Sequence, residues 1–192
     1  NTNSLEDFKE IADFFSPDIF ISENPMKGFE REISKYVKSK YAICVTSGTA
    51  AIKIALLAAG VKPNDEVITQ SFTFVAVIEA IVDIGAIPIV TEVDETLNMC
   101  PKDLKKKITT KTKAIIPVHM LGVSAEVDKI KKIASKHNIV VIDDNCEALG
   151  SKWKGKTLGN QFDMCAWSFD SGKTITTGEG GMITTNQKKF YK

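Results

Sequence analysis

The amino-acid sequence predicts an α/β fold with a mainly parallel sheet. Short β-rich runs alternate with helical segments from about residue 41 to residue 143, and parallel strands need crossover connections of this kind. The composition agrees with a packed core, because 43% of the 192 residues are hydrophobic and 26% are charged. A domain of ordinary globular composition is therefore expected over most of the chain.

The individual strands and helices are predicted from runs of apolar residues and from the residues that end them. Strands are expected at residues 41–46, 66–69, 88–93, 113–118 and 139–143, with two shorter ones at 164–169 and 182–185. Helices are expected at residues 48–59, 75–84 and 125–137. Gly60 and Gly85 follow the first two helices, and glycine is the usual helix stop.

The two ends of the chain indicate how it is organised. The first 40 residues are expected to form a helical arm, in which residues 29–40 pack on the sheet, and residues 41–192 are expected to form the large domain. The sequence has no initiator Met and stops where a further helix is expected to begin. We therefore expect a piece of a longer protein.

Charge and hydropathy argue against several classes of partner. Lys and Arg number 25 against 24 acidic residues, so the chain gives no reason to expect nucleic acid or an anionic membrane. The longest apolar stretch, residues 75–90, is interrupted by Glu79, Asp83, a Gly and a Pro, which disfavours a membrane span. The N-terminus is polar and lacks the apolar core of a signal peptide, so a cytoplasmic protein is expected.

The cysteines and histidines give no sign of a metal site. The four cysteines are widely spaced and form no CxxC pair, which favours buried reduced thiols: Cys44, Cys100, Cys146 and Cys165. His119 and His137 show no ligand spacing between them. No metal ion is expected.

The segment TSGTA at residues 46–50 lies where a strand ends and a helix begins. Free backbone N–H groups and the helix dipole favour an anion such as phosphate at that point, and Gly48 permits a close approach. Small residues at such a turn are also common helix N-caps. Phosphate binding and simple capping both stay open on this motif alone.

Two adjacent carboxylates, Asp143 and Asp144, end the apolar strand IVVID. Open α/β sheets place ligand-contacting groups at the carboxyl ends of their strands. Neighbouring residues of a strand point to opposite sides, so at most one of the two faces a given ligand. Such a carboxylate could pair with a protonated ring nitrogen or a metal ion, or it could cap a following helix.

Lys173 is the third candidate. It lies among small and hydroxylic residues, with Asp170 and Glu179 as its only charged neighbours in the sequence, whereas most other lysines lie in charge-rich stretches. Such a setting can expose an amine as a nucleophile toward a carbonyl. The alternative is an ordinary solvent-exposed lysine on a loop.

Five segments in this order resemble a known enzyme family: SGTAA at residues 47–51, DEVITQSFTFVAVIEAIVDIGAIPIV at 65–90, IPVHMLG at 116–122, VIDDNCEALG at 141–150 and SFDSGKTITTGEGG at 168–181. They resemble successive signatures of the DegT/DnrJ/EryC1/StrS aminotransferases, over nearly the whole chain from about residue 25. The resemblance implies the large domain of a fold type I aminotransferase, with a mainly parallel sheet of about seven strands. The smaller C-terminal domain, expected after about residue 220, is absent from this chain.

The resemblance also implies a role for each candidate. Lys173 stands at the lysine that holds pyridoxal 5'-phosphate (PLP) as a Schiff base and moves the proton during catalysis. Asp144 matches the carboxylate that keeps the pyridine nitrogen protonated, so that the ring remains an electron sink. The remaining cofactor-binding matches are the phosphate-binding turn, a phosphate-contacting hydroxyl and a stacking aromatic ring: Gly48 and Thr49, Ser168, and Phe74. Phe74 could also be a core residue.

Two positions depart from the family pattern. Glu147 stands where the family often has Gln, so a contact from Glu147 to the cofactor would change the charge of the site. Asp170, Ser171 and Gly172 replace a His-Pro or similar pair that often precedes the lysine, and this region could help to select the substrate. The retained Lys173 argues against the dehydratase branch, in which His replaces the lysine.

The implied function is transfer of an amino group from an amino-acid donor, with glutamate expected, to a keto-sugar that is often nucleotide-linked. Such enzymes serve amino-sugar biosynthesis for surface polysaccharides such as lipopolysaccharide, and the full-length protein is expected to be a homodimer. One alternative is a non-catalytic fragment or regulatory homologue that retains the PLP-binding fold. Another is a nucleotide-binding domain that uses SGTAA alone, but no GxGxxG or P-loop accompanies that segment.

Overall fold

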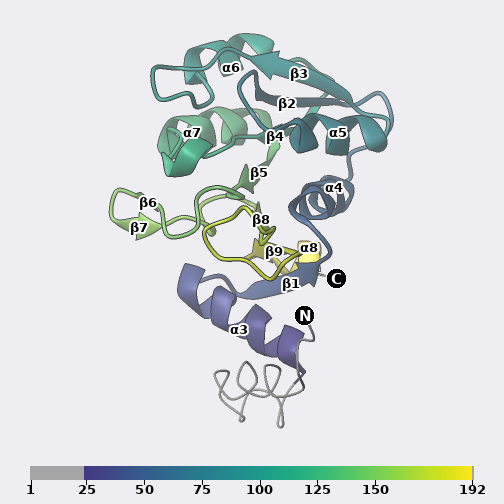
Figure 1. Ribbon diagram of the computed structural model, residues 1–192. Helices are drawn as coiled ribbons and strands as arrows, with labels where there is room; N and C mark the ends of the chain where they lie inside the picture. Colours follow the sequence, from purple (N-terminus) through teal and green to yellow (C-terminus); the bar gives the residue numbers. More distant parts are fainter. Residues whose placement is uncertain (1–23, 192) are drawn as a thin grey trace, which may run out of the picture.

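The computed structural model describes residues 24–191, which fold into alternating strands and helices (Figure 1). The strands are β1 (Tyr41–Val45), β2 (Glu66–Gln70), β3 (Ile87–Thr91), β4 (Thr112–Ile116), β5 (Val140–Asp144), β6 (Lys152–Trp153), β7 (Lys156–Thr157), β8 (Met164–Ser168) and β9 (Gly181–Thr185). The α-helices are α3 (Pro25–Val37), α4 (Gly48–Ala58), α5 (Val75–Asp83), α6 (Pro101–Lys107), α7 (Val127–His137) and α8 (Lys188–Tyr191). A short 3₁₀ turn spans Met120–Gly122.

Seven of these strands form one sheet in the order β1-β9-β8-β5-β4-β2-β3. The strands from β8 to β3 are parallel to their neighbours. Strand β9 lies antiparallel between β1 and β8. The structure therefore confirms a mainly parallel, seven-stranded sheet, with one reversed strand in it.

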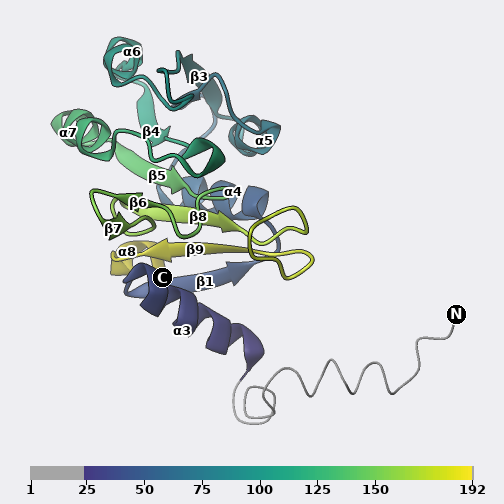
Figure 2. The ribbon, with the colours of Figure 1, turned by 60° about the vertical axis from the view of Figure 1, so that its left-hand side comes forward.

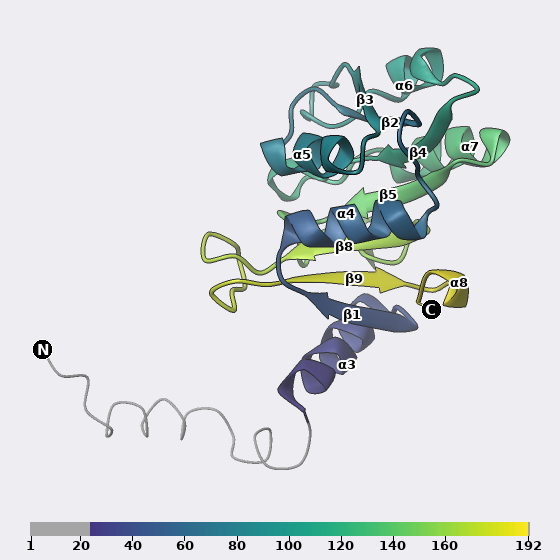
Figure 3. The ribbon, with the colours of Figure 1, turned by 90° about the vertical axis from the view of Figure 1, so that its right-hand side faces the viewer.

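Helices cover both faces of the sheet, as Figures 2 and 3 show. Helices α4 and α5 pack on one face, over a core that includes Ile52, Leu56 and Ile81. Helices α6 and α7 cover part of the other face, where Leu104 and Ile130 are buried. Helix α3 lies over β1 and its neighbours through a third cluster. The result is a sheet between two helical layers. The helices cover its faces, so a ligand site can form at the ends of the strands.

Most of the elements expected from the sequence are present, with ends shifted by one or two residues. Helix α7 begins at Val127 instead of residue 125, and it buries Val127, Ile130 and Ala134 at the predicted helical spacing. Helix α6 and the small hairpin of β6 and β7 were not expected. Helix α6 has only Leu104 buried, so it lacks a repeated apolar spacing.

The expected N-terminal arm falls partly outside the described residues. Within them, Asn24 caps α3 by accepting from Met26 N–H, and the helix buries Ile33 and Val37. The division of the chain at residue 40 stays a prediction. None of the described helices combines the length and the apolar character needed to cross a bilayer.

Candidate active site

The register of the sheet brings the candidate segments to one edge. Val45 is paired with Gly181, and Gly181 is also paired with Ser168. On the next strand, Asp144 is paired with Ala166. The turn after β1, the end of β5 and the loop after β8 therefore meet at the carboxyl ends of parallel strands, where open α/β sheets bind ligands.

A cavity of about 350 Å³ lies at this edge, a size within the usual range for small-ligand sites. All the residues predicted for the site line it: Gly48, Thr49, Phe74, Asp144, Glu147, Ser168 and Lys173. Apolar side chains supply another part of the wall: Ile52, Ala76, Val77, Val118 and Met120. Asp170 and Glu179 also line it. Residues that are distant in the sequence thus share one pocket.

The first turn of α4 has both features that its sequence allowed. Ser47 caps the helix, because its side chain accepts from Ala50 N–H at 3.1 Å and its carbonyl accepts from Ala51 N–H at 3.0 Å. The amides of Gly48 and Thr49 remain at the end of the helix that lines the pocket, as helix N-terminal amides have no partner within the helix. The cap is confirmed, and the two amides suit an anion.

Gly48 also packs closely against Ser168 and Cys146. A Cβ atom at Gly48 would lie 2.8 Å from the Cβ of Ser168 and 3.0 Å from the Sγ of Cys146. These separations are too short for any residue other than glycine without a shift of its neighbours. The helix end can therefore approach Ser168 closely, and the Ser168 side chain lies beside Gly48.

Asp144 is almost fully buried and lines the pocket. Its Oδ1 accepts from Cys146 N–H at 2.9 Å, so the carboxylate caps a turn, and no helix follows. Burial raises the pKa of Asp144, and the hydrogen bond from Cys146 partly opposes that shift. A cationic partner in the pocket would relieve the cost of burying this charge.

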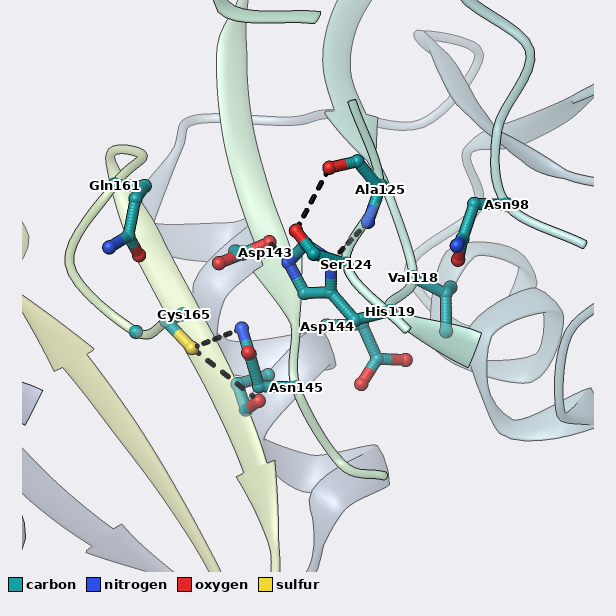
Figure 4. Close-up of polar contacts among 12 residues, drawn as sticks. Asn98, Val118, His119, Ser124, Ala125, Asp143, Asp144, Asn145, Gln161 and Cys165 are labelled. Carbon is teal, nitrogen blue, oxygen red and sulfur yellow. Dashed lines mark hydrogen bonds and ion pairs between the residues drawn. The ribbon is translucent and has the colours of Figure 1, made fainter. Parts of the chain in front are cut away.

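Asp143 points to the opposite side of the strand, as Figure 4 shows. Its Oδ1 lies 2.5 Å from Nε2 of His119, and both side chains are fully buried. The pattern of one carboxylate toward the pocket and one away from it is the pattern expected from strand geometry.

Lys173 lies in the loop that joins β8 to β9, and the loop is held by its own hydrogen bonds. Lys173 N–H donates to Asp170 O at 2.9 Å, and Gly172 N–H donates to Asp170 Oδ1 at 3.0 Å. The Lys173 side chain is 22% exposed, and its Nζ is 3.9 Å from Glu147 Oε1. The lysine is thus turned into the pocket, and the alternative of a solvent-exposed loop lysine is wrong.

Phe74 is not a core residue. It is 65% exposed, and Lys173 Nζ lies 5.9 Å from the centroid of its ring. A flat ligand held by Lys173 could therefore lie against this ring, which is the role that the resemblance implied.

Two features of the site were missed in the sequence. The sequence indicates only a buried thiol at Cys146, yet this residue lines the pocket and its amide donates to Asp144. Burial raises the pKa of the Cys146 thiol well above its ordinary range, so the side chain is a neutral wall. The pairing of His119 with Asp143 was also missed, because the two residues lie on different strand ends and only the fold brings them together.

The residues present fit PLP. Gly48 packs tightly against Ser168 and Cys146, which places the N-terminus of α4 beside the Ser168 hydroxyl, where a phosphate could bind. Asp144 offers a buried carboxylate to a ring nitrogen, and Lys173 offers an amine in the same pocket. Among residues 24–191, no three His, Cys, Asp or Glu side chains gather in a way that could hold a metal ion.

Comparison with known proteins identifies the family of the chain. The model of the DegT/DnrJ/EryC1/StrS aminotransferase family matches residues 2–192. GDP-perosamine synthase of Escherichia coli O157:H7 is 44% identical over 169 residues, which are 88% of this chain and 46% of that protein. The chain therefore spans about half the length of the curated relatives that it matches.

Solved structures agree with the sequence comparison. An aminotransferase from Psychrobacter cryohalolentis superposes with a TM-score of 0.88 at 36% identity, over 99% of this chain and 49% of that one. NtdA of Bacillus subtilis, solved with the cofactor PMP, has a TM-score of 0.85 at 30% identity, over 97% of this chain and 43% of that one. PMP is the aminated form of PLP. The fold is that of the fold type I aminotransferases, and the chain belongs to the PLP-dependent DegT/DnrJ/EryC1/StrS aminotransferase family.

Proposed function

We propose that the full-length protein is a PLP-dependent aminotransferase that moves an amino group from an amino acid, glutamate, to a keto-sugar. The observation that carries this proposal is the convergence of Lys173, Asp144 and the first turn of α4 on one cavity. Each supplies a different requirement: an amine, a buried carboxylate and free backbone amides. A pocket that needed only to bind a nucleotide would have no use for the first two.

The lining residues predicted for the site would each have a task toward the cofactor. When bound, PLP supplies an aldehyde that accepts the amino group and a ring that takes up electrons from the Cα–H bond. The amides of Gly48 and Thr49, with the Ser168 hydroxyl, would hold the phosphate. Asp144 would keep a proton on the ring nitrogen, and Phe74 would pack against the ring.

Lys173 is the group that moves protons. Its amine would hold PLP in the pocket when the cofactor is bound. As a free amine at the same place, it would accept the proton from the donor Cα, which is general acid–base catalysis by one positioned group. Glu147, 3.9 Å from Nζ, is placed to keep the amine in the pocket between these steps.

The substrate and pathway assignments rest on the relatives. GDP-perosamine synthases of three organisms are among them, and their name indicates a nucleotide-linked sugar. A spore coat polysaccharide biosynthesis protein is another relative. We infer a nucleotide-linked keto-sugar as substrate and a cytoplasmic role in making amino sugars for surface polysaccharides, lipopolysaccharide included.

A homodimer would complete the site. The charged side chains that line the cavity are four carboxylates and one amine: Asp144, Glu147, Asp170, Glu179 and Lys173. A phosphate-bearing cofactor adds more negative charge, which a cation from outside residues 24–191 would help to balance. A second copy of the protein is the proposed source.

A first experiment tests whether Lys173 holds the cofactor. The full-length protein is incubated with PLP, reduced with borohydride, digested and analysed by mass spectrometry. The proposal expects the cofactor's mass on Lys173, and no labelled lysine in Lys173→Ala. Lys156→Ala, which changes an exposed lysine, should label normally. Absence of label on Lys173 in the parent would contradict the proposed function. Label alone would still allow a non-catalytic homologue that binds PLP, which turnover in the next experiment excludes.

The acceptor is identified in a second step. The aminated cofactor form of the full-length protein is mixed with a panel of keto-sugars, with and without a nucleotide. Return of the original cofactor spectrum marks the sugar that accepts the amino group. A response to 2-oxoglutarate but to no sugar would contradict the sugar assignment and leave the aminotransferase assignment intact.

A further inference from the structure

A buried pair lies directly behind the carboxylate that faces the pocket. Asp143 and His119 are both fully buried, and Asp143 Oδ1 is 2.5 Å from His119 Nε2. The pair comes from the end of β5 and from the segment that follows β4 (Figure 4). Neither residue lines the cavity, so neither is available to contact a ligand there.

The hydrogen bonds fix the protonation of the imidazole. Ala125 N–H donates to His119 Nδ1 at 2.9 Å, so Nδ1 carries no proton. The ring proton of neutral His119 must then be on Nε2, which donates to Asp143 Oδ1.

The same segment also holds the main chain of Asp144. His119 N–H donates to Asp144 O at 3.1 Å, and Asp144 N–H donates to Pro117 O at 2.9 Å. Both backbone groups of Asp144 are therefore bound to residues 117–119. The side-chain bond between His119 and Asp143 joins the two segments a third time, from the opposite side of the strand.

Asp143 depends heavily on this bond. Its other oxygen, Oδ2, is buried and has no hydrogen-bond partner among the described residues. Without His119, neither oxygen of the buried Asp143 carboxylate would have a side-chain donor. Such a group is costly to leave in place, so the strand end would be expected to rearrange.

We propose that His119 and Asp143 are positioning residues, a buried pair that holds the end of β5 so that Asp144 stays aimed into the pocket. The role given to Asp144 rests on the proposed function. Catalysis is sensitive to such support, because a misplacement of about 1 Å can cost on the order of 100-fold in rate. The pair acts through geometry, so it needs the hydrogen bond and not the negative charge of Asp143.

The variants separate the bond from the charge. His119→Phe and Asp143→Leu remove the hydrogen bond. Asp143→Asn keeps an oxygen that can accept from Nε2–H and removes the charge. Thr69→Val is the matched control, since it deletes another buried side-chain hydrogen bond, from Thr69 Oγ1 to Ile116 O at 3.0 Å on neighbouring strands.

The first measurement uses the full-length apoprotein. Nitrogen-15 NMR of the His119 ring should show a protonated Nε2 and an unprotonated Nδ1, and Asp143→Leu should change the Nε2–H signal. A proton on Nδ1 in the parent would overturn the proposed bond whether or not the protein binds PLP.

The second measurement uses the full-length protein loaded with PLP. With the amino donor, kcat of the half-reaction should fall about 10–100-fold in His119→Phe and Asp143→Leu, while the KM for the donor stays within about threefold. Asp143→Asn and Thr69→Val should stay within about threefold of the parent in kcat. Equal losses in Asp143→Asn and Asp143→Leu, or parental rates in His119→Phe, would overturn the positioning role. A parent that binds no PLP would instead remove the proposed function, and the role of the pair with it.

Discussion

Lys173 and Glu147 face each other across the pocket, with 3.9 Å between Nζ and Oε1. The other oxygen of Glu147 accepts from Leu121 N–H at 3.2 Å, in the turn Met120–Gly122. Leu121 has a left-handed backbone, with φ of 52°, and this conformation turns its amide toward the carboxylate. Glu147 is therefore held at the lysine by the turn that forms the pocket wall.

Glu147→Gln is expected to speed cofactor uptake by the full-length apoprotein. Gln can still accept from Leu121 N–H, but it no longer holds the Lys173 amine in an ion pair, and that contact must break before the amine can attack an aldehyde. Both side chains are about one quarter exposed, so the pair contributes at most about 1 kcal/mol, or about a fivefold change in rate. Stopped-flow absorbance after mixing with PLP measures the rate of cofactor uptake. A slower uptake would mean that Glu147 assists the attack.

Gly48→Ala is expected to weaken PLP binding by more than about tenfold, because the new Cβ would meet Ser168 at 2.8 Å and Cys146 at 3.0 Å. Fluorescence titration of the apoprotein with PLP measures the affinity. Gly28→Ala in α3 is the control, since a Cβ there meets nothing within 4 Å and alanine favours the helix. Parental affinity in Gly48→Ala would place the phosphate elsewhere.

The site residues at the strand ends could be predicted from the sequence, but the side-chain contacts around them could not. Asp144 and Ser168 each end an apolar run, and the carboxyl ends of parallel strands meet by topology. The contact of Glu147 with Leu121 depends on one left-handed residue, and nothing in the local pattern signals it. The same holds for His119 and Asp143, which form a pair only once β4 and β5 lie side by side.

The short helix α6 was missed for a related reason. Its sequence PKDLKKK has a Pro start and a basic last turn, but only Leu104 is buried, so no apolar spacing repeats within it. It also ends without a glycine stop. Elements of this length are set by tertiary packing, here of Leu104 against the core beneath α7.

Phe74→Ala is expected to shorten cofactor retention without unfolding the protein. The Phe74 side chain is 65% exposed, so its loss removes little buried surface, whereas loss of a stacking face weakens a bound ring by about 1 kcal/mol. Loss of absorbance during dialysis measures retention. Phe72→Ala, at a residue that is 46% exposed and does not line the cavity, should retain the cofactor as the parent does. If both variants retain it equally well, Phe74 does not stack.

Asp144→Asn is expected to bind PLP nearly as well as the parent and to slow the half-reaction with the amino donor by roughly two or more orders of magnitude. Asn cannot supply the negative charge that keeps the ring nitrogen protonated, while the phosphate contacts remain. Single-turnover absorbance with a saturating donor gives the rate. An unchanged rate would remove Asp144 from the mechanism.

The same substitution is expected to stabilise the full-length apoprotein at neutral pH. Burial raises the pKa of Asp144 above its ordinary 3.8, so the folded state binds more protons than the unfolded state between those two values. The stability of the parent therefore falls as pH rises through the folded pKa, and the uncharged amide of the Asp144→Asn variant avoids this loss. The variant should melt about 2–4 °C higher than the parent at pH 7–8, with the gap closing as pH falls toward 4.

The control for this effect is Asp128→Asn, which should act in the opposite direction. Asp128 is exposed, and its hydrogen bond from Lys154 lowers the pKa of Asp128, so its contribution to stability is present above the unfolded pKa and is lost as pH falls. Asp128→Asn should melt slightly lower than the parent at pH 7, and the gap should close in acid. Melting curves of the three proteins from pH 4 to pH 8 test both signs. If the melting-temperature difference between Asp144→Asn and the parent widens toward acid, the surroundings stabilise the buried carboxylate. A cationic ligand would then have no burial cost of Asp144 to offset.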